Sequence, residues 1–484
     1  LIYIFSFCII CQAQTFSLSV IGGHGSGSYS EGDTIYIWAN PDFNEDVFDK
    51  WQGSATTYML EQNEWLTRIV VPTGSNISSL SATANFNDLS TSVTTVNDMI
   101  TLPGKNNGAM VQASVDVYYR VPQNPVGMIF CFHGTGGSGT GFETDFEKNA
   151  FFKAGANRNY IMVATDANEK TFGDQNNNGT MRWEINDPAT DNQSNNIDIK
   201  LIKALRDTML NRLSLQSSFP VFAMGTSNGA NFADLCAAAL GFNASGHMTG
   251  NGLPDVYAVR SDTRPVIFVQ SINDQNSSAS STVPVDNHNA LLNRGISSEF
   301  YWHKKTPVYE YRFVRIEDQS ISPNNSDSIY QRMLNTPGLL DSNNKLLISD
   351  NSGLPAGLFT GLGLSSDAIN NCENQIKIIN ADHKFHSHYN NRIIDFFDTH
   401  LTSTSSLYEA KNTESVNIYP NPTNSIVFIS NYNKNTNYSL HTSMGQLLKS
   451  NINSPDLDLS EYPNGIYILK INKGDYFSYK KIIK

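Results

Sequence analysis

The sequence predicts an α/β fold over about residues 95–403. Near-continuous apolar runs of strand length recur in this range, as in VGMIFCF, YIMVAT, PVFAM and PVIFVQ. Helical patterns separate these runs, most clearly NNIDIKLIKALRDTMLNRL, in which apolar residues recur at helical spacing. Strands that alternate with helices in this way are typical of a parallel sheet covered by helices on both faces.

Size and composition narrow the classes of function. The chain has 484 residues, enough for more than one domain, and its 39% hydrophobic and 11% aromatic residues are typical of a folded protein. A formal net charge of -12 disfavours nucleic acid or an anionic membrane as the main partner. No segment after the N-terminal run reaches the length of a transmembrane helix, so we do not expect an integral membrane protein.

Residues 1–13 form a short apolar run that ends in small and polar residues. This pattern is typical of a secretory signal peptide, here lacking its first residues and cleaved after Ala13. A lipoprotein signal through Cys11 is the alternative, which Ile10 disfavours because signal peptidases need small side chains there. The three cysteines that follow are widely spaced, so we expect buried free thiols or at most one disulfide.

Residues 15–90 predict a small β-domain, because stretches such as DTIYIWA alternate between apolar and polar side chains. The pattern VIGGHGSGSYSEGDTIYIWANPDFNEDVFDKWQGS, with SATANF after it, resembles the divergent InlB B-type repeat of bacterial surface proteins. The resemblance implies a β-grasp-like module. Phe48 and Trp51 are then expected in its core rather than in a sugar-binding surface.

The string MGTSNGANF at 224–232 places Ser227 between an apolar strand and a helical stretch. A nucleophile elbow needs this order of strand, turn and helix. Gly225 and Gly229 lack the Cβ atoms that would clash in so tight a turn. The N-terminus of the following helix would point its free N–H groups at the same place, where negative charge would develop.

Groups that would assist Ser227 occur on both sides of it. Upstream, HGTGG follows an apolar strand, and we expect the Thr135 and Asn228 N–H groups to form an oxyanion hole. His133 precedes the serine and is expected to shape this loop. Downstream, Asp274 follows the strand PVIFVQ, where it would orient a histidine base.

The base is expected shortly after NQIKIIN (374–380), which we interpret as a strand. His383 comes first and is preferred, His386 competes with it, and His388 is expected to face a helix or solvent. We expect no metal site here, because Asp382 is the one nearby carboxylate and the spacing places no ligand set on one helical face. No organic cofactor is needed either.

Three further expectations concern the surroundings of the site. The polar insertion at 304–372 is expected to act as a lid or binding loop. Trp183 could stack on a ring of the substrate. Asp286, the nearest rival of Asp274, is interpreted as a helix N-cap.

The motifs HGTGG and GTSNGA, Asp274 after its strand and DHKF before the last helix resemble the α/β-hydrolase superfamily. The helix at 195–213 is similar to the branch of secreted enzymes that resemble polyhydroxybutyrate depolymerases and feruloyl esterases. The resemblance implies a serine esterase with Ser227, His383 and Asp274 as its triad. Its substrate would be a polymer-linked ester, either a feruloyl or acetyl polysaccharide ester or a polyester such as polyhydroxyalkanoate.

After a polar linker at 404–415, residues 416–484 predict a small β-sandwich with Pro-Asn and Asn-Gly turns. These residues resemble the C-terminal sorting domain of the type IX secretion system of Bacteroidota. The resemblance implies recognition by that machinery, export, and either release or attachment to the cell surface. The alternative function is therefore a surface adhesin or glycan-binding protein that keeps a catalytically silent hydrolase fold.

Overall fold

The computed structural model describes residues 14–274, 282–316 and 318–401, and residues 418–484 apart from 424, 430–431, 433–435, 443–446, 451, 453 and 474–475. The expected signal peptide at 1–13 and linker at 404–415 lie outside these residues. The chain divides into two compact units, 1–404 and 405–484, and each is described by itself. Within the described residues, no helix is both long enough and apolar enough to span a membrane.

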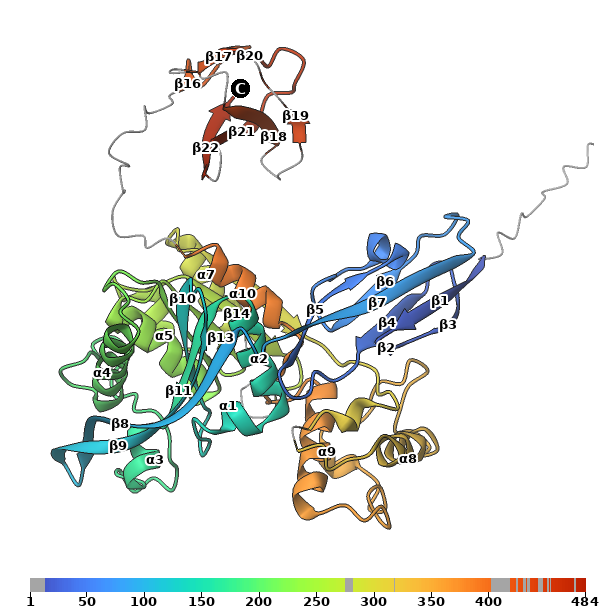
Figure 1. Cartoon of the computed structure of the whole chain (residues 1–484), viewed down its shortest axis with the longest axis vertical. Helices are drawn as coiled ribbons and strands as arrows, with labels where there is room; N and C mark the ends of the chain where they lie inside the picture. Colours follow the sequence, from blue (N-terminus) through green and yellow to red (C-terminus); the bar gives the residue numbers. More distant parts are fainter. Residues whose placement is uncertain are drawn as a thin grey trace, which may run out of the picture. The chain divides into compact units, whose positions relative to one another are not determined.

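A mixed sheet in the order β15-β14-β13-β12-β10-β11-β9-β8 forms the centre of the first unit (Figure 1). Its strands from β10 to β15 pair in parallel, and β9 joins them antiparallel through β11. Strands β8 and β9 form a long antiparallel hairpin. The strands are β8 (Val93–Asn106), β9 (Ala109–Pro122), β10 (Gly127–Phe132), β11 (Tyr160–Thr165), β12 (Val221–Thr226), β13 (Ala244–Met248), β14 (Val266–Ser271) and β15 (Ser298–His303).

Helices cover both faces of this sheet, as is required where the central strands are buried along their whole length. Along β10, Phe130 belongs to the core shared with α4, α5, α6 and α7, whereas Ile129 and Cys131 belong to the core shared with α1, α2 and α10. The predicted α/β class is therefore confirmed. The helices are α1 (Gly141–Thr144), α2 (Phe146–Asn157), α3 (Asn168–Phe172), α4 (Ile197–Arg212), α5 (Asn228–Leu240), α6 (Pro254–Ala258), α7 (Val283–Asn293) and α10 (Asn390–Asp398).

The interpretation of Asp286 as an N-cap is wrong. Helix α7 begins at Val283 with Thr282 as its N-cap residue, so Asp286 lies inside the first turn. Its carboxylate accepts a hydrogen bond from Thr282 Oγ1 at 2.6 Å. A carboxylate stabilises a helix both at the N-cap position and inside the first turn. The residue type alone therefore does not distinguish these two positions.

The N-terminal part of the first unit is a β-domain of two sheets, with strand orders β3-β1-β7-β5 and β2-β4-β6. Phe48 and Trp51 lie in its core, at 7% and 0% exposure. Trp51 Nε1 also donates to the Glu64 carbonyl oxygen at 3.0 Å. The elements are β1 (Thr15–Ile21), β2 (Gly23–His24), β3 (Gly27–Ser30), β4 (Thr34–Ala39), β5 (Asp46–Gln52), η1 (Ser54–Tyr58), β6 (Leu66–Val70) and β7 (Ser79–Asp88).

The insertion after β15 builds a small core of its own, to which Phe313, Ile329 and Cys372 contribute. It contains η2 (Arg312–Val314), α8 (Pro323–Leu334), η3 (Asn351–Gly353) and α9 (Ser366–Ile379). Helices α8 and α9 lie beside each other in Figure 1, apart from the central sheet.

The strand expected at 374–380 is wrong, because these residues form the last turns of α9 and its end. Ser365 caps the helix by accepting from the Ala368 N–H at 3.1 Å. Ala368, Cys372, Ile376 and Ile379 then share one buried face at the spacing of three and four residues that a helix requires. The short isoleucine-rich run resembles a strand only when it is considered without its N-terminal half.

The second unit contains two small antiparallel sheets, in the orders β16-β17-β20 and β19-β18-β21-β22. Val427, Leu440 and Leu469 lie in the core between them. The strands are β16 (Ile418–Tyr419), β17 (Ile426–Ile429), β18 (Asn437–Thr442), β19 (Leu447–Lys449), β20 (Asp456–Asp458), β21 (Ile466–Lys473) and β22 (Tyr476–Ile483).

Candidate active site

Ser227 occupies the turn between β12 and α5 with a strained backbone, at φ 57° and ψ -125°. A Cβ on Gly225 would lie 2.1 Å from the Gly229 carbonyl oxygen, and a Cβ on Gly229 would lie 2.4 Å from the carbonyl oxygens of Phe132 and His133. Gly225 is therefore required for the turn to close on itself, and Gly229 for the turn to pack against the end of β10. The turn holds the Ser227 side chain at the carboxyl end of the sheet, where α/β proteins bind their ligands.

His383 and Asp274 form a close pair. His383 Nδ1 lies 2.8 Å from each carboxylate oxygen of Asp274. The backbone segments next to the two residues hold the pair together, because the Asn273 N–H donates to the Ala381 carbonyl oxygen at 2.9 Å. Since Nδ1 donates to the carboxylate, Nε2 of the neutral ring carries the lone pair and can accept a proton.

Ser227 and His383 line the same cavity, of about 670 Å³. Thr135 lines it too, beside the turn at Gly134. Among the described residues, no group accepts a hydrogen bond from the Thr135 or Asn228 N–H. Ser227 and His383 are not hydrogen-bonded to each other within the same described set, and such contacts are often long before substrate binds.

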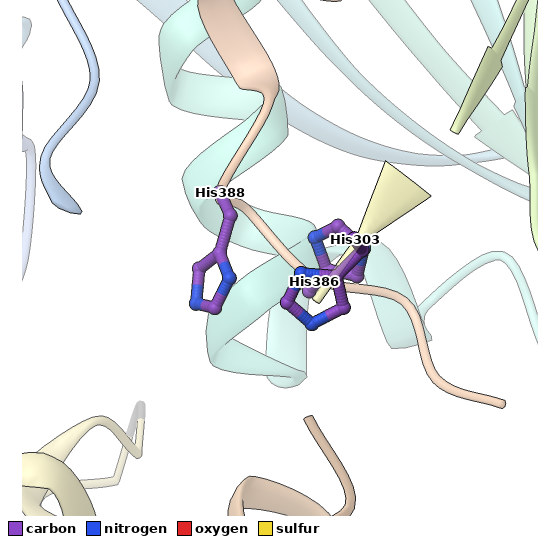
Figure 2. Close-up of side chains that lie close together, drawn as sticks. All are labelled: His303, His386 and His388. Carbon is purple, nitrogen blue, oxygen red and sulfur yellow. The ribbon is translucent and has the colours of Figure 1, made fainter. Parts of the chain in front are cut away.

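His386, the competing base, lies elsewhere. Its side chain is fully buried, and its ring centroid lies 4.0 Å from that of His303. His388 packs in the same group and is 6% exposed, so the expectation that it faces a helix or solvent is wrong (Figure 2). Of the three downstream histidines, only His383 contacts Asp274 in the described residues. Sequence reasoning did not separate them because all three follow within six residues of Asp382.

The expected stacking of Trp183 on a substrate is wrong. The indole is fully buried and stacks on Phe232, with ring centroids 4.7 Å apart. Its Nε1 donates to the His133 carbonyl oxygen at 3.0 Å, and its backbone N–H donates to Asn228 Oδ1 at 2.8 Å. Trp183 therefore supports the two loops that carry the expected oxyanion donors rather than a ligand. Its position among polar residues gave no sign of this burial.

His133 also supports this loop. Its Nδ1 lies 2.8 Å from the Gly134 carbonyl oxygen, and its Nε2 accepts from the Ala167 N–H at 3.2 Å. These two partners require the neutral ring with its proton on Nδ1. Burial lowers the pKa of His133 from its usual 6.5 to about 4, so the ring stays neutral at pH 7.

A buried network that sequence reasoning missed is centred on Glu147 of α2. The carboxylate accepts from Arg315 Nε, Gln375 Nε2 and the Ser387 N–H, each at 3.1 Å. Burial alone would raise the pKa of Glu147, but the guanidinium groups of Arg315 and Arg312 outweigh it and hold the pKa well below its usual value. No local motif marks these residues, because each of them belongs to a different segment.

Trp65 connects the N-terminal β-domain to the same network. Its Nε1 donates to Ser387 Oγ at 3.0 Å, and the Arg315 guanidinium lies 3.6 Å from its ring centroid. The segment that carries His383 is therefore held from three sides, by α2, by the insertion and by the β-domain.

Comparison with known proteins identifies the end of the chain. Residues 417–484 match the family described as secretion system C-terminal sorting domain. This domain indicates export by type IX secretion, to the extracellular space or the cell surface. No curated protein matches the chain.

Solved structures of esterases resemble less than half of the chain. A carboxylesterase of Bacillus cereus is 14% identical, with 39% of this chain and 84% of that chain covered and a TM-score of 0.28. An acetyl xylan esterase from Aspergillus awamori is 19% identical, with 38% and 73% covered and a TM-score of 0.28. A ferulic acid esterase is 11% identical, with 44% and 90% covered and a TM-score of 0.33.

We expect the buried His133 ring to make the fold sensitive to acid. The unfolded chain binds a proton at this histidine below pH 6.5, whereas the folded chain resists protonation down to about pH 4. Stability present above pH 6.5 is thus lost as the pH falls, by roughly 3 kcal/mol between pH 7 and pH 4. Urea unfolding at both pH values should give a smaller loss for His133→Asn than for the wild type. His400→Asn is the control and should keep the wild-type difference; equal differences in all three proteins would contradict the assignment.

Removal of the Glu147 charge should destabilise the first unit. Glu147→Gln leaves Arg315 and Arg312 buried without a counter-charge, so we expect a loss of about 3 kcal/mol in the free energy of unfolding. Glu143→Gln changes a less buried glutamate on the adjacent helix and should stay within about 0.5 kcal/mol of the wild type. Urea denaturation of the three proteins measures the difference. Equal stability of both variants would show that the network is not needed.

Proposed function

We propose that the protein is a secreted serine carboxylic-ester hydrolase. The observation that carries this proposal is that His383, paired with Asp274, lines one cavity together with a serine on a strained turn. A serine of this kind needs a base, and the base needs an orienting carboxylate. The C-terminal sorting domain supports action outside the cell.

In the proposed reaction, Ser227 Oγ attacks the carbonyl carbon of the ester while His383 Nε2 takes the hydroxyl proton. The tetrahedral intermediate collapses, and the protonated His383 returns that proton to the departing alcohol, which leaves an acyl-enzyme on Ser227. Water then repeats the sequence and releases the acid. Asp274 keeps the ring in the required tautomer and stabilises its protonated form.

The oxyanion of the intermediate would be bound by the N–H groups of Thr135 and Asn228. The Asn228 N–H is the first of α5, where the helix dipole favours negative charge. Thr135 follows Gly134, which packs against the Ser227 turn. The side-chain contacts between Asn228 and Trp183 would keep this donor aligned, because Trp183 is itself fixed by burial.

The cavity favours an ester of a hydroxyl-rich alcohol, such as an acetylated or feruloylated polysaccharide, over an apolar polyester. Its large apolar lining residues are confined to Phe146, Ile316, Ile378 and Phe385 among the described residues. The insertion contributes a mostly polar wall, on which hydroxyl groups would find donors and acceptors. Polar residues of this wall include Asp350, Asn351, Ser352, Asn371, Asn374 and Lys377.

The triad assignment predicts a complete loss of turnover in Ser227→Ala. We expect p-nitrophenyl acetate hydrolysis to fall by about 10³-fold or more, because removal of the nucleophile blocks the acyl-enzyme route. Ser138→Ala, in the nearby glycine-rich loop, is the matched control and should retain activity. A fluorophosphonate probe should label the wild type and Ser138→Ala but not Ser227→Ala. Absence of labelling in the wild type would instead favour a catalytically silent glycan-binding protein.

The substrate assignment predicts that the polar wall acts on the alcohol part of the ester. Asn371→Ala combined with Asn374→Ala should lower kcat/KM for acetylated xylo-oligosaccharides by about 10-fold, as expected for one or two lost hydrogen bonds. Hydrolysis of p-nitrophenyl acetate should stay unchanged, because this ester has no sugar hydroxyl groups for the wall to bind. If the wild type instead prefers polyhydroxyalkanoate over the acetylated sugar, the proposed substrate class is wrong.

A further inference from the structure

A group of three buried histidines lies outside the cavity that contains Ser227. His303 ends strand β15, whereas His386 and His388 belong to the loop before α10 (Figure 2). One ring nitrogen from each histidine lies within 4.8 Å of the other two. The triplet therefore brings together two segments that are more than 80 residues apart in the sequence.

The hydrogen bonding of the triplet is incomplete. Among the described residues, neither ring nitrogen of His386 has a partner, and neither does Nε2 of His388. His303 Nε2 lies 2.8 Å from the Ile378 carbonyl oxygen, so it donates there and leaves the Nδ1 lone pair free for another ligand. Metal-binding histidines are commonly held in this way, by donation of the second ring nitrogen to a backbone carbonyl.

The residue type of the three side chains suits a metal ion. A neutral imidazole offers the lone pair that a divalent transition metal requires.

A second cavity, of about 450 Å³, gives access to the triplet, and His303, His388 and Glu64 line it. Glu64 Oε1 accepts from the Arg392 N–H at 3.0 Å. Burial raises the pKa of Glu64 well above its usual value, which favours its neutral carboxyl group.

Arg392, the cation that acts on Glu64, is already paired with Glu61. A bound divalent cation in the triplet would supply the missing partners for the ring nitrogens.

We propose that His303, His386 and His388 bind a zinc-class divalent cation, with water as the fourth ligand. Three imidazoles and one oxygen are a common tetrahedral set for Zn²⁺. Bonds of about 2.0–2.1 Å place ligand nitrogens about 3.3 Å apart, so rings now within 4.8 Å need to close by no more than about 1.5 Å. The ion would join β15 to the loop that carries His383. This site is independent of ester hydrolysis.

The test uses the full chain, purified without a polyhistidine tag and freed of metal by a chelator. Titration with ZnCl₂ should show one ion bound per chain, and Zn²⁺ at about 100 times its dissociation constant should raise Tm by about 3 °C. Binding of Co²⁺ should produce the visible absorption of a tetrahedral ion. Ser227→Ala should bind both metals as the wild type does, so a failed esterase assay leaves this result unaffected.

Substitution identifies the ligands. His386→Phe keeps the buried ring volume but removes both nitrogens, and we expect at least a 100-fold loss of Zn²⁺ affinity with loss of the cobalt absorption. His288→Phe, on α7 away from the triplet, is the matched control and should bind normally. His388→Gln gives a second test of the site, in case His386→Phe does not fold. Absence of stoichiometric Zn²⁺ and Co²⁺ binding by the wild type, or unchanged binding by folded His386→Phe, would overturn the proposal.

Discussion

The buried carboxylate of Glu147 is the interaction on which the arrangement of the first unit depends. It lies on α2, yet its partners come from the insertion and from the loop between α9 and α10. A buried carboxylate is unfavourable unless charges and donors surround it, so these segments can pack in few other ways. Trp65 adds the N-terminal β-domain to the same point. The loop that carries His383 is therefore positioned by Glu147 and Trp65, which lie outside the Asp274–His383 pair.

The two loops that build the candidate site are constrained in a different way, by the close approach of their backbones. Gly225 and Gly229 let the Ser227 turn pack on the end of β10, and the buried Trp183 fills the space behind it. Rigid support of this kind keeps the Ser227 side chain and the Asn228 backbone in place. The insertion completes the cavity with a polar wall.

Much of this site was predictable from local patterns, because strand, turn and helix signals act over short distances. The turn at Ser227 and the loop at HGTGG could be placed by residue type and order alone. The choice between His383 and His386 could not, since both follow Asp382 closely and their difference lies in burial. The helix at α9 was missed because its apolar face shows only when the run is considered together with its first half.

The sequence by itself determined the α/β class, the order of the expected triad residues and the presence of a sorting domain at the end of the chain. These features depend on periodicity and motifs that neighbouring residues define. Only the tertiary structure decided which histidine meets Asp274, that Trp183 is buried, and that His303 joins His386 and His388. Contacts between distant segments depend on how whole layers pack, and no local pattern records that packing.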